Sequence, residues 1–382
     1  MTSPVISQDE LFRYSRHMTI PEVGLEGQKR LKSTSVLIVG VGGLGSPAAL
    51  YLAAAGIGHL GLVDDDEVEV SNLQRQIVHG TSQVGNPKVD SGKMRLSDLN
   101  PLIQIDTFLS AFNQKTAAEI AAQYDIIVDC SDNFATRYLV NDLCVLTGRP
   151  DIYGAVNRFE GQVSVFDGRW GPCYRCLFPQ PPSEEGAPTC RDSGVLGVVP
   201  GVIGTLQATE VIKLALGIGD PLIGKLLVFD ALEAEFKSIR LTKRPYCSLC
   251  GVNPQITQLI EMEDCCLKNN DLLVDPLDRI TAKELDKHLK DSDPPLVIDV
   301  RDPVEKQISV IEGARSIPLE HLIEFINDLN GFQDHEIVVF CRTGNRSKTA
   351  LRILKSHGFK KVKELTGGIN AWAQLDPDRF QY

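Results

Sequence analysis

Short apolar runs alternate with amphipathic stretches through the first part of the chain. Two amphipathic stretches at 9–17 and 25–32 come first, and the apolar run at 35–39 then predicts a buried strand. The same alternation predicts helices at 44–55, 88–99 and 115–123 and strands at 59–63, 103–108 and 125–129. Because strands that alternate with helices are typical of α/β proteins, we predict a Rossmann-like, doubly wound sheet.

The pattern changes after residue 160. Apolar runs predict later strands at 161–166, 225–229 and 235–241, for which an antiparallel arrangement is open. The segment 179–194 contains four prolines and is typical of an exposed, mobile loop. The segment 195–216 predicts a buried helix that contains glycine.

A second α/β pattern follows a polar stretch at 264–275. It predicts helices at 282–289, 319–329 and 347–357 and strands at 296–300 and 336–340. We therefore expect a first domain over 1–264, a linker over 265–275 and a second, smaller α/β domain over 276–382.

Composition narrows the classes of protein. The chain has 382 residues, 43 % of them hydrophobic, and a net charge of −11, which argues against a nucleic-acid partner. The apolar stretch 41–63 contains six glycines and Pro47, so we expect turn, helix and strand there and no membrane span. Residues 1–4 begin no charged and apolar leader, so we expect a cytoplasmic protein whose ten cysteines stay reduced.

A glycine-rich turn follows the strand predicted at 35–39. Its glycines are Gly40, Gly42, Gly43 and Gly45. Glycine permits a tight turn there and lets phosphates approach a helix N-terminus. Asp64 ends the next predicted strand, where a carboxylate suits a ribose hydroxyl. Since both features also fit a nicotinamide dehydrogenase, the residues that follow must decide.

Two cations, Arg75 and Lys88, follow this aspartate. Either alone would be read as a surface charge, but together they would neutralise charge that develops on the β- and γ-phosphates of ATP. Hydride transfer has no such need. Asp132 follows the strand at 125–129 and could hold Mg²⁺ near the α-phosphate, while Asp129 could equally cap the next helix.

Four cysteines form two C-x-x-C pairs that lie far apart in the sequence. They are Cys173, Cys176, Cys247 and Cys250. Four thiolates in two such pairs fit a closed tetrahedral zinc site. A redox motif would need only one pair, and disulfides would need an oxidising compartment, so we predict Zn²⁺.

A further cysteine, Cys341, opens a loop between the strand at 336–340 and the helix at 347–357. The loop consists of Cys341, Arg342, Thr343, Gly344, Asn345 and Arg346. Backbone N–H groups, a helix N-terminus and two arginines favour the thiolate there. Tyrosine phosphatases use a similar loop with one more residue between cysteine and arginine. The shorter loop suits a sulfane sulfur better, and the arginines would then bind an anionic sulfur donor.

Residues 1 to about 260 resemble the MoeB/ThiF family of ubiquitin-activating-enzyme-like adenylyltransferases. The matching segments are Arg13–Arg16, the glycine turn, Ser71–Gln76, Asn86–Lys88, Asp129–Asn133 and Cys173–Cys176. Enzymes of this family use ATP to adenylate the C-terminal Gly-Gly carboxylate of a small ubiquitin-fold sulfur carrier. The implied roles are ribose binding for Asp64, phosphate contacts for Asn72, Arg75 and Lys88, and Mg²⁺ support for Asp132.

The same resemblance bears on two further residues. It implies a homodimer in which Arg16 enters the ATP site of the neighbouring subunit. It also places a cysteine at Cys190, in the proline-rich loop, that is covalently linked to the carrier in some members and dispensable in others. Because Arg191 and exposure favour a reactive thiol there, a covalent role for Cys190 is one of two open alternatives.

Residues from about 276 to 382 resemble a rhodanese, a sulfurtransferase domain that carries a persulfide. The matching segments are 296–303, 313–319, the Cys341 loop and 365–372. The usual Gly-His pair before Gly313 is absent, which leaves the packing of that segment open. Together, the two resemblances imply a MoeZ-like fusion of adenylyltransferase and rhodanese.

Such a fusion would join two chemical steps. A persulfide on Cys341, taken from thiosulfate or a cysteine desulfurase, would attack the acyl-adenylate and leave a thiocarboxylate. Three alternatives are a dehydrogenase, a ubiquitin-like conjugation enzyme that forms a carrier thioester, and a non-catalytic binding module. Carriers for molybdopterin, thiamin, tRNA thiolation and cysteine synthesis share the Gly-Gly tail, so the sequence does not identify the carrier.

Overall fold

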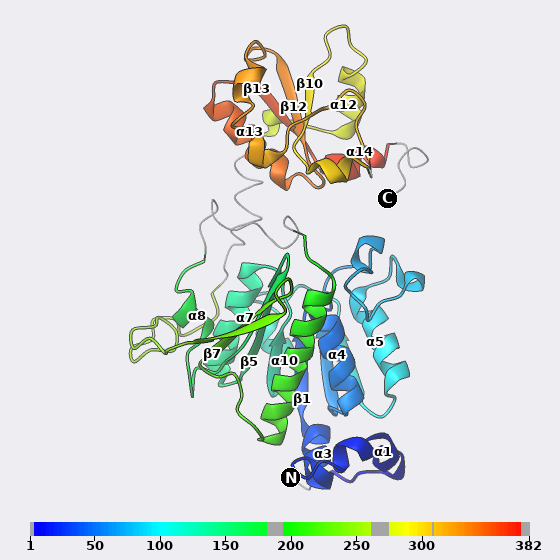
Figure 1. Ribbon diagram of the computed structural model, residues 1–382, viewed down its shortest axis with the longest axis vertical. Helices are drawn as coiled ribbons and strands as arrows, with labels where there is room; N and C mark the ends of the chain where they lie inside the picture. The colour runs from blue at the N-terminus through cyan, green and yellow to red at the C-terminus, as the bar shows by residue number, and fades with distance from the viewer. Residues whose placement is uncertain (1–3, 182–193, 261–274, 308, 376–382) are drawn as a thin grey trace. The chain divides into compact units, whose positions relative to one another are not determined.

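The computed structural model describes residues 4–181, 194–260, 275–307 and 309–375 (Figure 1). The chain forms two compact units, residues 1–265 and 266–382, which are described separately below. Cys190 and most of the predicted proline-rich loop and linker lie outside the described residues.

The first unit is built on one mixed sheet of eight strands in the order β3-β2-β1-β4-β5-β6-β7-β8. These strands are β1 (Ser35–Val39), β2 (His59–Val63), β3 (Gln104–Phe108), β4 (Ile126–Asp129), β5 (Asp151–Asn157), β6 (Glu160–Phe166), β7 (Lys225–Asp230) and β8 (Glu235–Arg240). The pairs from β3 to β5 are parallel and those from β5 to β8 are antiparallel. The predicted Rossmann-like sheet is therefore confirmed, and its later strands run antiparallel.

The described helices of this unit lie before, between and after the strands. They are α1 (Gln8–Arg13), α2 (Ser15–Met18), α3 (Gly24–Ser33), α4 (Gly45–Ala55), α5 (Lys88–Leu99), α6 (Ala117–Ala121), α7 (Phe134–Thr147), α8 (Tyr174–Leu177) and α10 (Val198–Leu216). In Figure 1, α4 and α10 run side by side across one face of the sheet.

Successive side chains of β1 point to opposite faces of the sheet, as in any β-strand. Val36 and Ile38 enter the core beneath α4 and α10, whereas Leu37 and Val39 enter a second core on the side of α7. All four are at most 2 % exposed, so β1 is covered on both faces, as is usual for a central parallel strand.

The apolar helix α10 is long enough to cross a membrane by length and composition alone. In this structure it packs on α4, β5 and β6, with Val199, Ile203 and Val211 fully buried. Packing within the unit thus accounts for its composition. The apolar stretch 41–63 folds as a turn, α4 and β2, as predicted.

Three parts of the first unit differ from the prediction. The predicted helix at 9–17 is split into α1 and α2 at Tyr14, whose buried ring hydroxyl accepts a hydrogen bond from the Asn100 side chain. The sequence analysis also missed α7 and β5. α7 buries three polar or charged residues, Arg137, Asn141 and Asp142, at positions that a hydrophobic pattern assigns to the surface.

The second unit contains a parallel sheet of five strands in the order β11-β10-β12-β13-β9. The strands are β9 (Arg279–Ile280), β10 (Leu296–Asp299), β11 (Arg315–Ser316), β12 (Glu336–Phe340) and β13 (Lys361–Leu365), and the α-helices are α12 (Ala282–His288), α13 (Asn345–Ser356) and α14 (Gly368–Ala373). Instead of the helix predicted at 319–329, short 3-10 helices form at Leu319–His321 and Ile326–Leu329. The central strand β12 buries both faces, with Ile337 and Val339 in one core and Val338 and Phe340 in the other.

The contact between α10 and α4 predicts opposite effects for two glycines of α10. A Cβ added at Gly204 would lie 2.3 Å from the Leu44 carbonyl oxygen, whereas one added at Gly201 would meet nothing within 4 Å. We expect Gly204→Ala to lower the free energy of unfolding by about 1–3 kcal/mol through overpacking. As a matched control, Gly201→Ala should raise it by about 0.5–1 kcal/mol, because alanine favours a helix. Urea denaturation measures both, and a Gly204→Ala protein as stable as the wild type would contradict this close approach.

Candidate functional site

The space available for a side chain differs among the four glycines of the turn between β1 and α4. Gly40 has φ +93°, and a Cβ there would lie 2.9 Å from the Cys130 carbonyl oxygen. A Cβ at Gly45 would lie 2.0 Å from the carbonyl oxygen of Gly40 itself. Neither position can hold a larger residue without a shift of the backbone. At Gly42 and Gly43, a Cβ would instead approach the side chains of Gln76 and Arg75, at 3.6 and 3.5 Å.

Asp64 fastens this turn to the end of β2. Its Oδ2 accepts a hydrogen bond from the Val41 N–H at 2.7 Å, and its Oδ1 accepts one from the Asp66 N–H at 2.9 Å. Burial raises the pKa of Asp64, an effect that the charge of Lys88 opposes. Each carboxylate oxygen retains a second lone pair, so a ribose hydroxyl could still donate to Asp64.

The predicted phosphate-binding residues lie beside the turn but have protein contacts of their own. Lys88, the first residue of α5, is buried, and its Nζ lies 2.7 Å from Oδ2 of Asp66. Arg75 donates from Nη1 to the Ser71 carbonyl oxygen at 3.1 Å. Buried Asn72 accepts a hydrogen bond from the Glu69 N–H. Both cations lie near the turn, since Lys88 Nζ is 3.9 Å from Oδ1 of Asp64 and the Arg75 side chain lies beside Gly43.

Asp129 and Asp132 at the end of β4 have different surroundings. Asp129 is 1 % exposed, and its Oδ1 accepts hydrogen bonds from the N–H and hydroxyl of Ser131 at 2.9 and 2.6 Å. Asn133, not Asp129, caps α7 by accepting from the Thr136 N–H. Asp132 is exposed beyond the strand end, where its carboxylate could reach a metal ion on a bound nucleotide.

Sequence reasoning assigned no role to Gln76 or His79, which lie under the turn. Gln76 is 4 % exposed, and its Oε1 has no hydrogen-bond partner among the residues that the structure describes. The two ring nitrogens of His79 lie 2.9 Å from the Ser91 hydroxyl and 3.0 Å from the Val41 carbonyl oxygen. Gln76 belongs to the Ser71–Gln76 segment already singled out, so its position was available as a signal. His79 is a buried histidine without a motif, and nothing in the sequence marks it.

Arg16 lies apart from these residues on α2. The next residue, His17, lines a cavity with Ala54 and Ala55 at the carboxyl end of α4. The glycine turn lies at the amino end of this 11-residue helix, about 16 Å away along its axis. The structure therefore does not bring Arg16 to the glycine turn of its own subunit.

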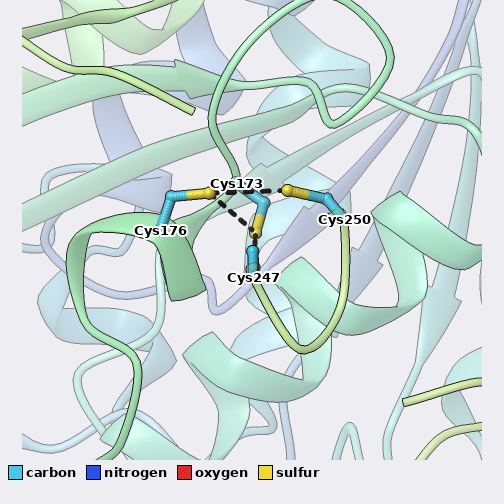
Figure 2. A group of neighbouring side chains, drawn as sticks. All are labelled: Cys173, Cys176, Cys247 and Cys250. Carbon is cyan, nitrogen blue, oxygen red and sulfur yellow. Dashed lines mark hydrogen bonds between the residues drawn. The ribbon is translucent and has the colours of Figure 1, made fainter. Parts of the chain in front are cut away.

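The four predicted zinc ligands converge from two distant segments (Figure 2). Cys173 and Cys176 lie at the start of α8, and Cys247 and Cys250 follow β8. The Sγ atom of Cys173 lies 4.0 Å from that of Cys176 and 3.6 Å from that of Cys247, and the Sγ atoms of Cys176 and Cys250 are 3.4 Å apart. Tetrahedral Zn²⁺ with ordinary Zn–S bonds would space its sulfurs at about 3.8 Å, so the cluster fits this ion.

The chemistry of the thiols supports the same interpretation. Hydrogen bonds with Cys176 and Cys250, together with burial, raise the pKa of the Cys173 thiol. Cys176 receives an N–H hydrogen bond from Arg244, which favours its thiolate. Four adjacent buried sulfurs cannot all ionise without a cation between them, and Zn²⁺ would displace their protons.

Cys341 lies at the carboxyl end of β12 and is buried. Its Sγ accepts a hydrogen bond from the Gly344 N–H at 3.2 Å, and the Ser347 hydroxyl lies 3.7 Å away. Gly344 has φ +111°, which turns its N–H into the loop and which glycine adopts without strain. The structure brings one of the predicted backbone donors, the Gly344 N–H, to this sulfur.

The N-terminus of α14 holds the loop from behind. The Cys341 and Arg342 carbonyl oxygens accept hydrogen bonds from the Ile369 and Asn370 N–H groups at 2.8 and 3.2 Å. A Cβ at Gly368 would lie 2.4 Å from the Cys341 carbonyl oxygen, so only glycine permits this approach. Because the carbonyls face α14, the loop is free to present N–H groups to the sulfur.

The two arginines of the loop differ in their surroundings. Arg342 is exposed. Arg346 forms a bidentate ion pair with Glu305, in which Nη1 and Nη2 lie 2.7 and 2.9 Å from the two carboxylate oxygens. We expected both arginines to bind an anionic donor, and this contact instead engages Arg346 with the protein.

The segment that lacks the usual Gly-His pair still packs on the sheet. Buried Arg301 forms a bidentate pair with Asp299 and donates to the Ser309 carbonyl oxygen at 2.7 Å. Ser309 thereby anchors this segment to the end of β10.

Comparison with known proteins places these sites in families. Residues 14–249 match the ThiF family, and residues 281–375 match the Rhodanese-like domain. The chain belongs to the ThiF family. Its second unit carries the rhodanese-like domain, so the predicted fusion of the two is confirmed.

Two similar proteins share this arrangement along nearly the whole chain. The pig (Sus scrofa) protein named adenylyltransferase and sulfurtransferase MOCS3 is 44 % identical over 96 % of this chain and 86 % of its own. The probable adenylyltransferase/sulfurtransferase MoeZ of Mycobacterium tuberculosis is 44 % identical over 99 % of this chain and 96 % of its own. The chain is accordingly an enzyme of the predicted class, an adenylyltransferase and sulfurtransferase.

The ThiF fold is also seen in solved structures. The crystal structure of E. coli MccB with ATP is 27 % identical, with a TM-score of 0.55, and the match covers 62 % of this chain and 74 % of that one. MccB with AMPCPP and the peptide MccA matches with a TM-score of 0.56 at 26 % identity. Because ThiF members use ATP, the family favours ATP over the nicotinamide cofactor of the dehydrogenase alternative.

Convergence of the four cysteines predicts one tightly bound zinc ion per chain. We expect Cys176→Ser to lose the ion and to lower the free energy of unfolding by several kcal/mol, because metal binding contributes directly to folding. Cys144→Ala is the matched control, since Cys144 is equally buried but lies outside the cluster. Elemental analysis and thermal denaturation measure both effects, and a Cys176→Ser protein that retains a full equivalent of zinc would contradict the assignment.

Proposed function

We propose that this enzyme adenylates the C-terminal Gly-Gly carboxylate of a small ubiquitin-fold sulfur carrier and then converts it into a thiocarboxylate. The observation that carries the proposal is the presence in one chain of a ThiF-type glycine turn with Lys88 and Arg75 and a cysteine loop of rhodanese type. The named relatives combine the same two activities.

In the first step, the carrier carboxylate attacks the α-phosphate of ATP and pyrophosphate leaves. The backbone of the glycine turn and the N-terminus of α4 would hold the phosphates, with Asp64 at the ribose. Lys88 and Arg75 would neutralise charge on the departing pyrophosphate, assisted by Asn72. Mg²⁺ would screen the phosphates, and Asp132 would hold it on the exposed side of the turn.

In the second step, a thiolate on Cys341 takes a sulfane sulfur from its donor and becomes a persulfide. The terminal persulfide sulfur attacks the acyl-adenylate, so that a C–S bond forms and AMP leaves. A second thiol then cleaves the acyl disulfide and is itself oxidised to a disulfide with the former carrier of the sulfur. Cys190, which lies outside the described residues, is our candidate for that thiol.

The active enzyme would be a cytoplasmic homodimer. Arg16 lies toward the opposite end of α4 from its own glycine turn, which supports the proposal that it serves a neighbouring subunit instead. Zinc-binding cysteines and a reactive Cys341 would both have to stay reduced, a condition that the cytoplasm provides.

A conjugation enzyme that passes the carrier to a protein as a thioester is less well supported. Such an enzyme would not need a persulfide loop, whereas this chain has both Cys341 and the N–H group of Gly344 directed at it.

Molybdopterin- and thiamin-type carriers both have the required tail, and mass spectrometry of each after reaction would identify the substrate.

If adenylation and sulfur transfer are separate steps, a variant of one site should lose sulfur transfer alone and a variant of the other should lose both. Incubation of a carrier with enzyme, ATP and thiosulfate should exchange one carrier oxygen for sulfur, as seen in the mass of the intact carrier. Cys341→Ala should abolish this exchange but keep carrier-dependent ATP–pyrophosphate exchange, whereas Lys88→Ala should slow both about a hundredfold through loss of a phosphate contact. Normal thiocarboxylate formation by Cys341→Ala would show that the sulfur step is wrongly assigned.

A shared site between subunits predicts complementation. When Lys88→Ala and Arg16→Ala chains are co-expressed, half of the dimers should be mixed, and one of the two sites in each should be complete. We therefore expect about a quarter of the wild-type pyrophosphate exchange. The control combines Lys88→Ala with Arg75→Ala, which act in the same site and should not complement. If the Arg16 mixture recovers no activity either, Arg16 does not act across the dimer.

A further inference from the structure

The charge of the persulfide loop is lower than its sequence indicates. Arg346 is 18 % exposed at its side chain and lies between two carboxylates, Glu305 at 2.7 Å and Asp302 at 3.4 Å. Although burial opposes each shift, the ion pair lowers the pKa of Glu305 and raises the pKa of Arg346, so both groups are charged at neutral pH. One cation and two anions therefore lie together beside the sulfur.

Arg342, the other arginine of the loop, differs from Arg346 in its exposure and contacts. Its side chain is exposed, and no hydrogen bond or ion pair engages its guanidinium within the part of the chain that the structure describes. A donor that approaches Cys341 thus meets Arg342 as an available cation and the Glu305–Arg346–Asp302 group as a region of net negative charge.

Glu305 reaches Arg346 from outside the loop, on a 3-10 helix at Pro303–Gln307. Its carboxylate also accepts a hydrogen bond from the Asp302 N–H, which fixes its orientation toward the guanidinium. Arg346 in turn interacts electrostatically with Cys341. A carboxylate held in this way acts on the reactive sulfur through the arginine and need not touch the donor.

We propose that Glu305 determines the sulfur-donor specificity of this loop: by neutralising Arg346, it disfavours a dianion such as thiosulfate relative to a donor of lower charge, such as a persulfide. This inference rests on the proposed sulfurtransferase function. In the reaction concerned, the Cys341 thiolate attacks the outer sulfur of thiosulfate, the S–S bond of thiosulfate breaks, and sulfite leaves with the electron pair. Cyanide can then take the terminal sulfur as thiocyanate and restore the thiolate.

The first test is the thiosulfate–cyanide sulfurtransferase reaction of the full-length, zinc-containing protein. Removal of the charge in Glu305→Gln should release Arg346 and lower the KM for thiosulfate by about threefold to tenfold, as expected for one unit charge near a dianion in a partly solvated site. Arg342→Gln should raise KM by a similar factor. The double variant Glu305→Gln/Arg346→Gln should return KM to near the wild-type value.

Asp302→Asn is the matched control, because Asp302 makes only the longer contact to Arg346 and its side chain is 56 % exposed, so that water screens its charge from the donor. It should change KM by less than twofold. A KM that is unchanged or higher in Glu305→Gln would overturn the proposal, since loss of packing alone does not improve the binding of an anion. An equal effect of Asp302→Asn would also overturn it, because general surface charge would then suffice.

The second test does not depend on sulfur chemistry. The rates at which iodoacetate and iodoacetamide alkylate Cys341 are followed by mass spectrometry of the Cys341 peptide, and their ratio reports the local charge. Glu305→Gln should raise the iodoacetate-to-iodoacetamide ratio about threefold, and Arg342→Gln should lower it. If the wild type fails to use thiosulfate, the proposed donor is wrong, yet this ratio still decides the role of Glu305. An unchanged ratio in Glu305→Gln would refute it.

Discussion

The register of β1 with its two neighbours is the constraint on which the nucleotide site depends. Val39, the last residue of β1, lies opposite Val63 of β2 and Asp129 of β4. The glycine turn, Asp64 and Asp132 therefore leave the sheet at one level, although they are far apart in the sequence. The register is fixed because both faces of β1 are buried, and a slip by one residue would exchange its two sets of side chains.

In both units a neighbouring group holds the loop at the end of a central strand, but hydrogen-bond donor and acceptor are exchanged between the two. In the first unit, a carboxylate of Asp64 holds the turn through the Val41 N–H. In the second, N–H groups of α14 hold the loop through the carbonyls of Cys341 and Arg342. The second arrangement turns the loop's carbonyls away from its centre, where the Gly344 N–H donates to the Cys341 Sγ. The first keeps the Asp64 carboxylate at the rim, where it could accept a hydrogen bond from the sugar hydroxyl in the proposed role.

Features that depend on local residue type were predictable from the sequence. The bounds of β1, β2 and α5 follow from continuous apolar or amphipathic runs, and the glycine turn is recognisable because no other residue fits at Gly40 or Gly45. The C-x-x-C spacing likewise indicated the cysteine cluster before the two pairs were seen together. Features that depend on distant partners were not predictable. Glu305 lies 41 residues from Arg346, and no local pattern links the two.

A cation paired with a carboxylate can bind an incoming anion only if the carboxylate can be released into water. The exposure of the carboxylate therefore distinguishes Lys88 from Arg346. Lys88 and Arg346 both look available in the sequence, and both meet a carboxylate in the structure. Asp66 beside Lys88 is 46 % exposed at its side chain, so water could solvate it if a phosphate took its place. Glu305 is 20 % exposed and bidentate, so its displacement by a donor would leave a poorly solvated charge. Pairing with an exposed carboxylate is therefore compatible with the phosphate contact proposed for Lys88, whereas pairing with Glu305 makes Arg346 part of the loop's structure.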